Sequence, residues 1–137
     1  MDQEITRAEM AVLLARNGMS AKSEGAEFTD VSPDYWANNP IQQVVAAGLM
    51  QGYPSQQFKP ELNVTRAEMA TIVFLWKGLE RSEGTPAFDD VVHHWAKSIV
   101  DAVFRAGWMQ GDPDGSFKPD RALTRAEAVS IIHGLLD

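Results

Sequence analysis

The sequence lacks cysteine altogether, has no excess of basic residues and contains no long apolar run. None of its 137 residues is Cys, which excludes a disulfide framework and a thiolate metal site. The formal net charge is -7, whereas a protein that binds nucleic acid needs a basic face that releases counterions. No stretch approaches the roughly 20 apolar residues of a membrane helix. We therefore expect neither nucleic acid nor membrane insertion.

The first residues, Met-Asp-Gln-Glu, also lack the basic and apolar regions of a secretory signal. The sequence is therefore interpreted either as a cytoplasmic protein or as one piece of a larger protein. The absence of cysteine is compatible with an oxidising exterior, where stray thiols are a liability. The composition, 45% hydrophobic and 23% charged, is that of a globular chain.

The sequence does contain a repeat. Thr-Arg-Ala-Glu occurs at residues 6–9, 65–68 and 124–127, always 59 positions apart, and the last two copies share further upstream matches at the same offset. We predict half a repeat followed by two whole ones. The predicted boundaries are the second half of repeat 1 at 1–18, a linker at 19–27, repeat 2 at 28–79, a linker at 80–87, and repeat 3 at 88–137.

Each whole repeat is predicted to hold two helices joined by an ordered loop. The second helix begins at Thr-Arg-Ala-Glu, which has the pattern of a capping box, and the first ends at Gly48 or Gly107 as a left-handed cap. In repeat 2, Asn39 and Pro40 are expected as N-cap and first helical residue. Helical spacing predicts these core residues: Met10, Leu13, Leu14, Ile41, Val44, Val45, Met69, Ile72, Val73, Trp76, Ile99, Val100, Val103, Ala128, Ile131, Ile132 and Leu135.

The arginine of the tetrapeptide is not explained by capping. It falls at the first helical position, where the helix dipole disfavours a cation. One hypothesis is an anion site, in which the guanidinium and the N–H groups of the helix N-terminus hold a carboxylate. The alternative is that each arginine links neighbouring repeats by pairing with an acid such as Asp30 or Asp90. The three residues concerned are Arg7, Arg66 and Arg125.

Other candidate binding residues lie near the start of the first helix and in the loop. Trp36 and Trp95 either fill the core or offer a face on which a sugar ring can stack; Trp76 and Trp108 are taken as packing. Gly52 and Gly111 are expected to allow an unusual backbone conformation.

Catalytic and metal-binding patterns are missing. No nucleophile elbow, metalloprotease helix or phosphate-binding glycine loop occurs. Asp112-Pro-Asp114-Gly115 resembles the opening of a calcium loop, but its distal glutamate is out of register. We expect no enzyme activity, no cofactor and no metal.

Taken together, Phe-x-Asp-Val, Trp-Ala, Ala-Gly-x-Met-x-Gly, Phe-Lys-Pro and Thr-Arg-Ala-Glu resemble the S-layer homology domain across nearly all of residues 5–136. The resemblance implies an all-α module of tandem helix-loop-helix repeats around a pseudo-threefold axis. It also implies anchoring of surface proteins and exoenzymes to the bacterial wall, through a secondary cell-wall polysaccharide that often ends in pyruvylated N-acetylmannosamine.

By the same resemblance, the arginines bind in grooves between repeats. The grooves would be lined by the following residues: Arg7, Arg66, Arg125, Trp36, Trp95, Gly52, Gly111, Asp30 and Asp90. The first repeat lacks its front half, so a groove that needs it is incomplete unless another chain supplies that half. The alternative function is structural self-assembly within a surface layer.

Overall fold

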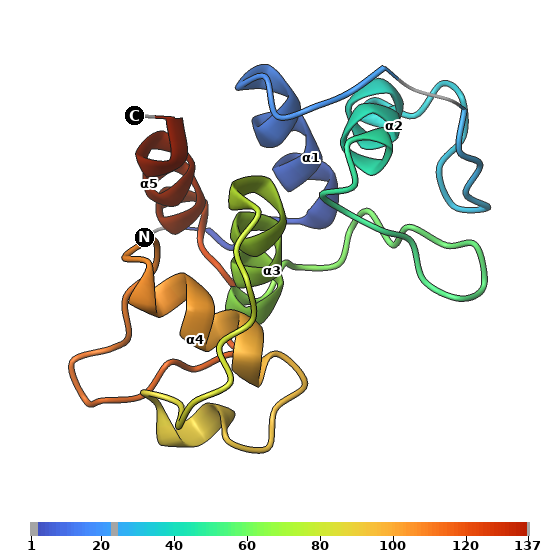
Figure 1. The fold of residues 1–137 in the computed structure, drawn as a ribbon. Helices are drawn as coiled ribbons and strands as arrows, with labels where there is room; N and C mark the ends of the chain where they lie inside the picture. The colour runs from blue at the N-terminus through green and yellow to red at the C-terminus, as the bar shows by residue number, and fades with distance from the viewer. Residues whose placement is uncertain (1–2, 23–24, 137) are drawn as a thin grey trace. The chain divides into compact units, whose positions relative to one another are not determined.

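The structure is a computed structural model that describes residues 3–22 and 25–136. Within these ranges five α-helices follow one another (Figure 1), with a short 3₁₀ turn, η1, at Asp89–Val91. The helices are α1 (Arg7–Arg16), α2 (Asn38–Ala46), α3 (Arg66–Lys77), α4 (Lys97–Arg105) and α5 (Arg125–Leu136). Within the described ranges there is no β-strand beyond isolated bridges. The all-α prediction is confirmed, and no described helix is long and apolar enough to cross a membrane.

The chain forms two compact units that are offset from the sequence repeats. The first unit is Gln3–Val64, and the second begins at Thr65. In the first unit α1 packs on α2, and in the second α3 packs on α4 (Figure 1). Each unit therefore combines the second helix of one repeat with the first helix and loop of the next, and the second unit also contains α5. Neither helix of such a pair could bury its apolar face alone.

Capping boxes start α1, α3 and α5. The Thr6 hydroxyl accepts from the N–H of Glu9 at 3.1 Å, and the Glu9 carboxylate accepts from the N–H of Thr6 at 2.9 Å. Thr65 and Glu68 repeat the exchange at 3.1 and 2.8 Å, as do Thr124 and Glu127 at 3.1 Å in both directions. The predicted structural role of the threonine and glutamate is confirmed three times.

The first helices end as the glycines predict. Gly48 and Gly107 have φ angles of 76° and 86°, a conformation that costs glycine little. The next residue, Leu49 or Trp108, donates its N–H back to Val44 or Val103 at 3.1 Å. This is a Schellman cap, which satisfies carbonyls that the helix leaves open.

The predicted start of α2 is wrong by two residues. The N-cap is Ala37, without a side-chain hydrogen bond, and the helix begins at Asn38. Pro40 is therefore the third helical residue rather than the first. Proline fits there as well, because the first four N–H groups of a helix have no partner within it.

Most predicted core residues are buried. The largest fully buried side chains are Phe58 and Phe117, which lie in the loops and were not in the predicted set. Trp76 is an error: its side chain is 38% exposed. It lies one turn beyond Val73, and α3 has twelve residues against nine in its partner α4. Periodicity identifies the face of a helix but not where the partner helix stops. Three further predicted core residues are only half-buried: Leu13, Val45 and Ile131.

Candidate functional site

The loop between the two helices of a repeat is held by an aspartate. Asp30 accepts hydrogen bonds from the N–H groups of Phe58 and Lys59, both at 2.8 Å. Asp90 does the same for Phe117 at 3.0 Å and Lys118 at 2.8 Å. Lys59 and Lys118 both have a φ of 57°, which is uncommon for a residue with a side chain. The two carboxylates thus stabilise a strained loop end.

The glycines Gly52 and Gly111 make room for an aromatic ring. A Cβ atom on Gly52 would lie 2.4 Å from a ring carbon of Phe28, and one on Gly111 would lie 2.2 Å from a ring carbon of Phe88. Neither glycine is among those with positive φ. The expected unusual backbone conformation is therefore wrong, and close approach of the ring is the reason for glycine here.

Arg7 and Arg66 both reach the loop of the repeat that follows. Arg7 donates from Nε to the carbonyl of Phe58 at 2.8 Å and from Nη2 to that of Gln51 at 2.5 Å. Arg66 donates in the same way to Phe117 at 2.8 Å and Gln110 at 2.7 Å. In both cases the partners lie 51 and 44 residues further along the chain.

These contacts explain why arginine occupies an unfavourable helical position. Arg7 is 6% exposed and Arg66 is 5% exposed, and each guanidinium lies over a phenylalanine ring, at 4.4 Å from Phe58 and 4.5 Å from Phe117. Both arginines link repeats, as the alternative hypothesis held. The link runs through backbone carbonyls instead of the carboxylates of Asp30 or Asp90.

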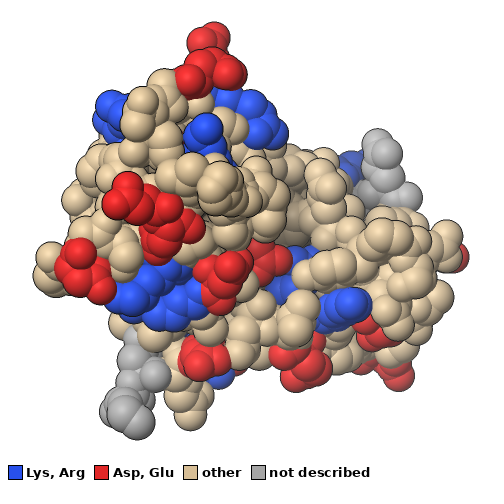
Figure 2. All heavy atoms as spheres, turned by 90° about the horizontal axis from the view of Figure 1, so that it is seen from below, with Lys and Arg blue, Asp and Glu red and all other residues tan. Residues whose placement is uncertain are grey.

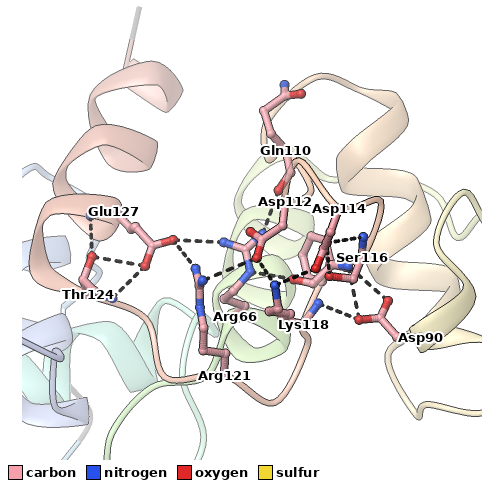
Figure 3. A network of polar contacts seen from close by, with 11 residues as sticks. Arg66, Asp90, Gln110, Asp112, Asp114, Ser116, Lys118, Arg121, Thr124 and Glu127 are labelled. Atoms are coloured by element: carbon pink, nitrogen blue, oxygen red, sulfur yellow. Dashed lines mark hydrogen bonds and ion pairs between the residues drawn. The ribbon is translucent and has the colours of Figure 1, made fainter.

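In the second unit Arg66 belongs to a wider network of charges (Figure 3). Its Nη1 lies 3.1 Å from the carboxylate of Glu127, which Arg121 also contacts at 2.9 Å. Burial lowers the pKa of Arg66, and the negative charge of Glu127 opposes that effect. Arg66, Gly111 and Glu127 line a pocket of about 680 Å³. Two of the predicted site residues, Arg66 and Gly111, thus come together here.

The loop of the second unit carries its own ion pairs. Lys118 contacts the carboxylates of Asp112 and Asp114, and this hydrogen bonding raises the pKa of Lys118. Hydrogen bonds from the hydroxyl and N–H of Ser116 lower the pKa of Asp114 to about 2. The two aspartates that resemble a calcium loop therefore hold a lysine, and no group of acidic or histidine residues in the described ranges is arranged for a metal.

Charges of opposite sign alternate in this way over the face drawn in Figure 2, where blue side chains lie directly beside red ones.

The corresponding loop of the first unit differs, because Tyr53 stands where Asp112 stands in the second. The Arg7 guanidinium and the Lys59 ammonium lie 5.0 and 4.5 Å from the centre of the Tyr53 ring.

The tryptophans Trp36 and Trp95 are exposed, at 62% and 63%. Each lies beside a second ring: Tyr35 at 5.8 Å from Trp36 and His94 at 5.2 Å from Trp95. Trp36 lines a pocket of about 320 Å³ with Arg16 and Pro40. Trp95 is not among the residues that line the Arg66 pocket. The core-filling alternative is therefore wrong for both indoles.

Arg125 occupies the same place in α5 as Arg7 and Arg66 in their helices, but it is exposed. Arg7 and Arg66 are buried against the loops that lie 44 and 51 residues downstream. The three arginines are thus equivalent in sequence and not in environment.

Sequence reasoning missed Arg16 and Tyr35. Tyr35 donates to the Glu61 carboxylate at 2.6 Å, and His94 and Asp120 form the corresponding pair at 2.8 Å. A comparison of the repeats at a 59-residue offset pairs Tyr35 with His94 and Glu61 with Asp120, a signal that was available. Arg16 has no such signal, because residue 75 at the same offset is Leu.

The repeats match a known protein family. The family model of the S-layer homology domain matches residues 27–70 and 87–129. The chain is 36% identical to Cell surface glycoprotein 1 of Acetivibrio thermocellus, over 99% of the chain and 6% of that protein. It is 33% identical to the Cellulosome-anchoring protein of the same organism, over 99% of the chain and 33% of that protein.

A third relative is Exoglucanase XynX, also of Acetivibrio thermocellus, at 33% identity over 97% of the chain and 13% of the relative. The chain spans no more than a third of the length of any of these three relatives. The likeness covers both repeats and the half-repeat before them, and so the chain belongs to the S-layer homology domain family.

Proposed function

We propose that this chain is a non-catalytic module that anchors a larger protein to the bacterial cell wall by binding a secondary cell-wall polysaccharide. The observation that carries the proposal is the pair of exposed indoles, Trp36 and Trp95, at the same position of both whole repeats. Each indole lies beside a second ring, Tyr35 or His94, and a contiguous exposed apolar patch, unlike a single exposed side chain, is a feature of binding surfaces.

The relatives favour an anchoring role for this chain over an enzymatic one. The names of the first three describe a surface glycoprotein, an anchoring protein and an exoglucanase. The chain is 33–36% identical to all three, although their names describe proteins with different functions. A shared anchoring role, with a bacterial cell-surface location, accounts for this better than a shared reaction.

We place the anionic end of the polysaccharide, a pyruvylated sugar, near the arginines. Arg66 supports this in the second unit because it lines a pocket with Gly111. Arg125 is an exposed residue at the N-terminus of α5, where the helix dipole also favours an anion. In the first unit, Arg16 beside Trp36 adds a cation to the stacking face.

The stacking proposal is tested by Trp36→Ala and Trp95→Ala, alone and combined. Loss of an indole that carries binding lowers affinity for purified wall polysaccharide by more than about tenfold, since tryptophans at binding hot spots contribute at least about 2 kcal/mol. Trp76→Ala is the matched control, because Trp76 is exposed but lies in the last turn of α3. Equal loss in all three variants would refute stacking at Trp36 and Trp95.

The anion proposal is tested with Arg125→Ala against pyruvylated and depyruvylated forms of one polymer. Removal of Arg125 is expected to lower the affinity for the pyruvylated form about tenfold and to leave the affinity for the depyruvylated form unchanged. Lys22→Ala removes the same charge from an exposed position outside the helices. Arg66→Ala is less informative, because it would also release the carbonyls of Gln110 and Phe117.

A second candidate is self-assembly within a surface layer. It is favoured by the large apolar side chains that the second unit leaves exposed, which besides Trp95 are Leu75, Trp76, Val92, Val129 and Leu136. Sedimentation that shows a monomer at high concentration would count against it, and a dimer that dissociates in Leu75→Lys would support it.

A further inference from the structure

Arg16 is the last residue of α1, and its side chain is exposed. It makes no hydrogen bond, ion pair or ring contact with any residue in the described part of the chain. Each of the other arginines has such a contact or another electrostatic interaction: Arg7, Arg66, Arg81, Arg105, Arg121 and Arg125. The dipole of α1 favours a cation in its last turn, but it uses none of the five N–H donors of the guanidinium. Those donors are available to a ligand.

The guanidinium of Arg16 borders a pocket between α1 and α2. The pocket has a volume of about 320 Å³, which is close to the lower end of the range for small-molecule sites. Its apolar part is half-buried and its polar and aromatic part is exposed. The lining residues are Val12, Ala15 and Arg16 of α1, Trp36 just before α2, and Pro40 and Gln43 of α2.

The charge of this pocket is positive and uncompensated. One cation lines it and no carboxylate does, and the first turn of α2 contains no acidic residue. The Arg66 pocket differs, because backbone carbonyls and Glu127 already occupy the three nitrogens of Arg66 (Figure 3). The carboxylates of Asp112 and Glu127 also line that pocket. An anion therefore meets a free guanidinium at Arg16 and a neutralised one at Arg66.

Trp36 adds an apolar surface to the positive charge. Its side chain is 62% exposed. The ring of Tyr35 lies 5.8 Å from it, and Tyr35 is held in turn by its hydrogen bond to Glu61 at 2.6 Å. The indole thus has a supported position and an open surface. The negative face of an aromatic ring attracts groups with a partial positive charge, such as the C–H groups on one side of a pyranose ring.

We infer that this pocket binds an acidic sugar, with the ring against Trp36 and the carboxylate in a two-point contact with Arg16. The amide of Gln43 both donates and accepts hydrogen bonds, and it binds a neighbouring hydroxyl group. The carboxylate is either that of a hexuronic acid or that of a pyruvate ketal, since both project from the edge of the sugar ring. The inference rests on the proposed function only in making this sugar a part of the wall polymer.

The second unit lacks the cation of this site. At the 59-residue offset Leu75 stands in place of Arg16, and Ala102 stands in place of Gln43. Trp95 is as exposed as Trp36, but the residue equivalent to Arg16 carries no charge. Only the Trp36 site is therefore expected to distinguish an acidic sugar from a neutral one, and Trp95 serves as an internal reference.

The test is an NMR titration of the full chain, labelled with ¹⁵N, that follows the indole N–H signals. The ligands are sodium methyl β-D-glucuronide, the 4,6-pyruvate ketal of methyl β-D-glucoside, and methyl β-D-glucoside itself. We expect the Trp36 signal to shift saturably with at least one acidic glycoside, at millimolar affinity and about fivefold more tightly than with the neutral glycoside. The Trp95 signal should show no such preference. Trp36→Phe and Trp95→Phe assign the two signals.

The variant Arg16→Gln removes the charge and should lower the affinity for the acidic glycoside to that for the neutral one. Tm should hardly change, because Arg16 is exposed and contacts no described residue. Arg16→Lys keeps the charge but loses the planar fork, so it should retain only part of the preference. Lys22→Gln is the matched control, because it removes a charge from an exposed residue of the same unit that does not line the pocket.

Three results would each overturn the inference. One is the absence of a saturable Trp36 shift with either acidic glycoside at concentrations up to about 100 mM, which corresponds to less than the weakest useful affinity. The second is equal affinity for the acidic and neutral glycosides. The third is an undiminished preference in Arg16→Gln. Saturation by the glucuronide alone identifies a uronic acid, and saturation by the ketal alone identifies a pyruvylated sugar; both support the site.

Failure of this inference is distinguishable from failure of the proposed function. If the chain binds wall polysaccharide but Trp36 shows no preference for an acidic glycoside, the acidic-sugar site fails and wall anchoring stands. If the preference at Trp36 depends on Arg16 but the chain does not bind wall polysaccharide, wall anchoring fails and the acidic-sugar site stands.

Discussion

The ring of Phe88 lies so close to Gly111 that one added methyl group decides the packing of the loop. Gly111→Ala would place Cβ 2.2 Å from a ring carbon, so the ring or the backbone must move. We expect the free energy of unfolding to fall by about 1–3 kcal/mol, the usual cost of overpacking, as measured by denaturant unfolding.

Gly134→Ala is the matched control for that substitution. Gly134 lies in α5 and has no atom within 4 Å of its would-be Cβ, so alanine is expected to stabilise the protein by up to about 1 kcal/mol through helix propensity. Both changes replace glycine by alanine, but they are expected to change the free energy of unfolding in opposite directions. A loss at Gly134 as large as that at Gly111 would contradict this account.

Tyr35 predicts how stability changes at alkaline pH. Burial, followed by its hydrogen bond to Glu61, raises the pKa of Tyr35 from 10.0 to about 12. Between these values the folded state keeps the proton while the unfolded state loses it. The contribution of Tyr35 to stability is therefore complete below pH 10 and is lost as pH rises from 10 to about 12.

Absorbance at 295 nm measures this titration directly. Glu61→Gln should bring the midpoint closer to 10, because it removes the negative charge that raises the pKa, and Tyr35→Phe identifies the signal by its loss. A native midpoint near 10 would show that the hydrogen bond to Glu61 does not form.

At the scale of elements, the loop between the helices depends on its aspartate. Asp90 accepts from two consecutive N–H groups and holds Lys118 at a φ of 57°. Asp90→Ala leaves these groups without a partner and should lower the free energy of unfolding by about 1–3 kcal/mol. The adjacent Asp89→Ala removes the same charge from an exposed side chain and should change stability by less than about 0.5 kcal/mol. Thermal unfolding of both variants compares them.

Helix boundaries set by local chemistry could be predicted from the sequence. The capping boxes and the glycine caps each depend on residues within five positions of one another, and all of them were found where expected. The start of α2 was not, because Ala37 caps it without a side-chain hydrogen bond. A helix start whose N-cap makes no side-chain hydrogen bond has no sequence pattern from which it could be predicted.

The site was predicted less completely, because its contacts are distant in sequence. The partners of Arg66 lie 44 and 51 residues away and are carbonyls, which every residue possesses. Residue identity therefore cannot reveal them. The exposure of Trp36 and Trp95 was left open for a related reason, since spacing shows the face of a helix and not whether another element covers it.

At the scale of the whole molecule, the unit of folding differs from the unit of sequence. The second compact unit begins at Thr65, so it includes α3 and the contacts of Arg66 with the loop of repeat 3. A fragment of residues 65–137 is expected to unfold cooperatively on heating. A fragment of residues 88–137, a whole repeat by sequence, loses α3 and its packing on α4 and should not.

Circular dichroism against temperature distinguishes the two fragments. Arg66→Lys in the longer fragment is the control for the arginine itself, because lysine keeps the charge but cannot reproduce the two-point contact. A cooperative transition in the shorter fragment, equal to that of the longer one, would show that the sequence repeat folds alone.

The contacts of Arg7 and Arg66 with the repeat that follows also constrain which duplications and deletions the gene can tolerate. Each arginine finds its carbonyls at fixed distances of 44 and 51 residues. A duplication or deletion of a whole 59-residue period preserves every such match, because each arginine is then still followed by a loop at the same separation. Proteins that carry the module are therefore expected to differ by complete periods, and the number of Thr-Arg-Ala-Glu copies counts those periods.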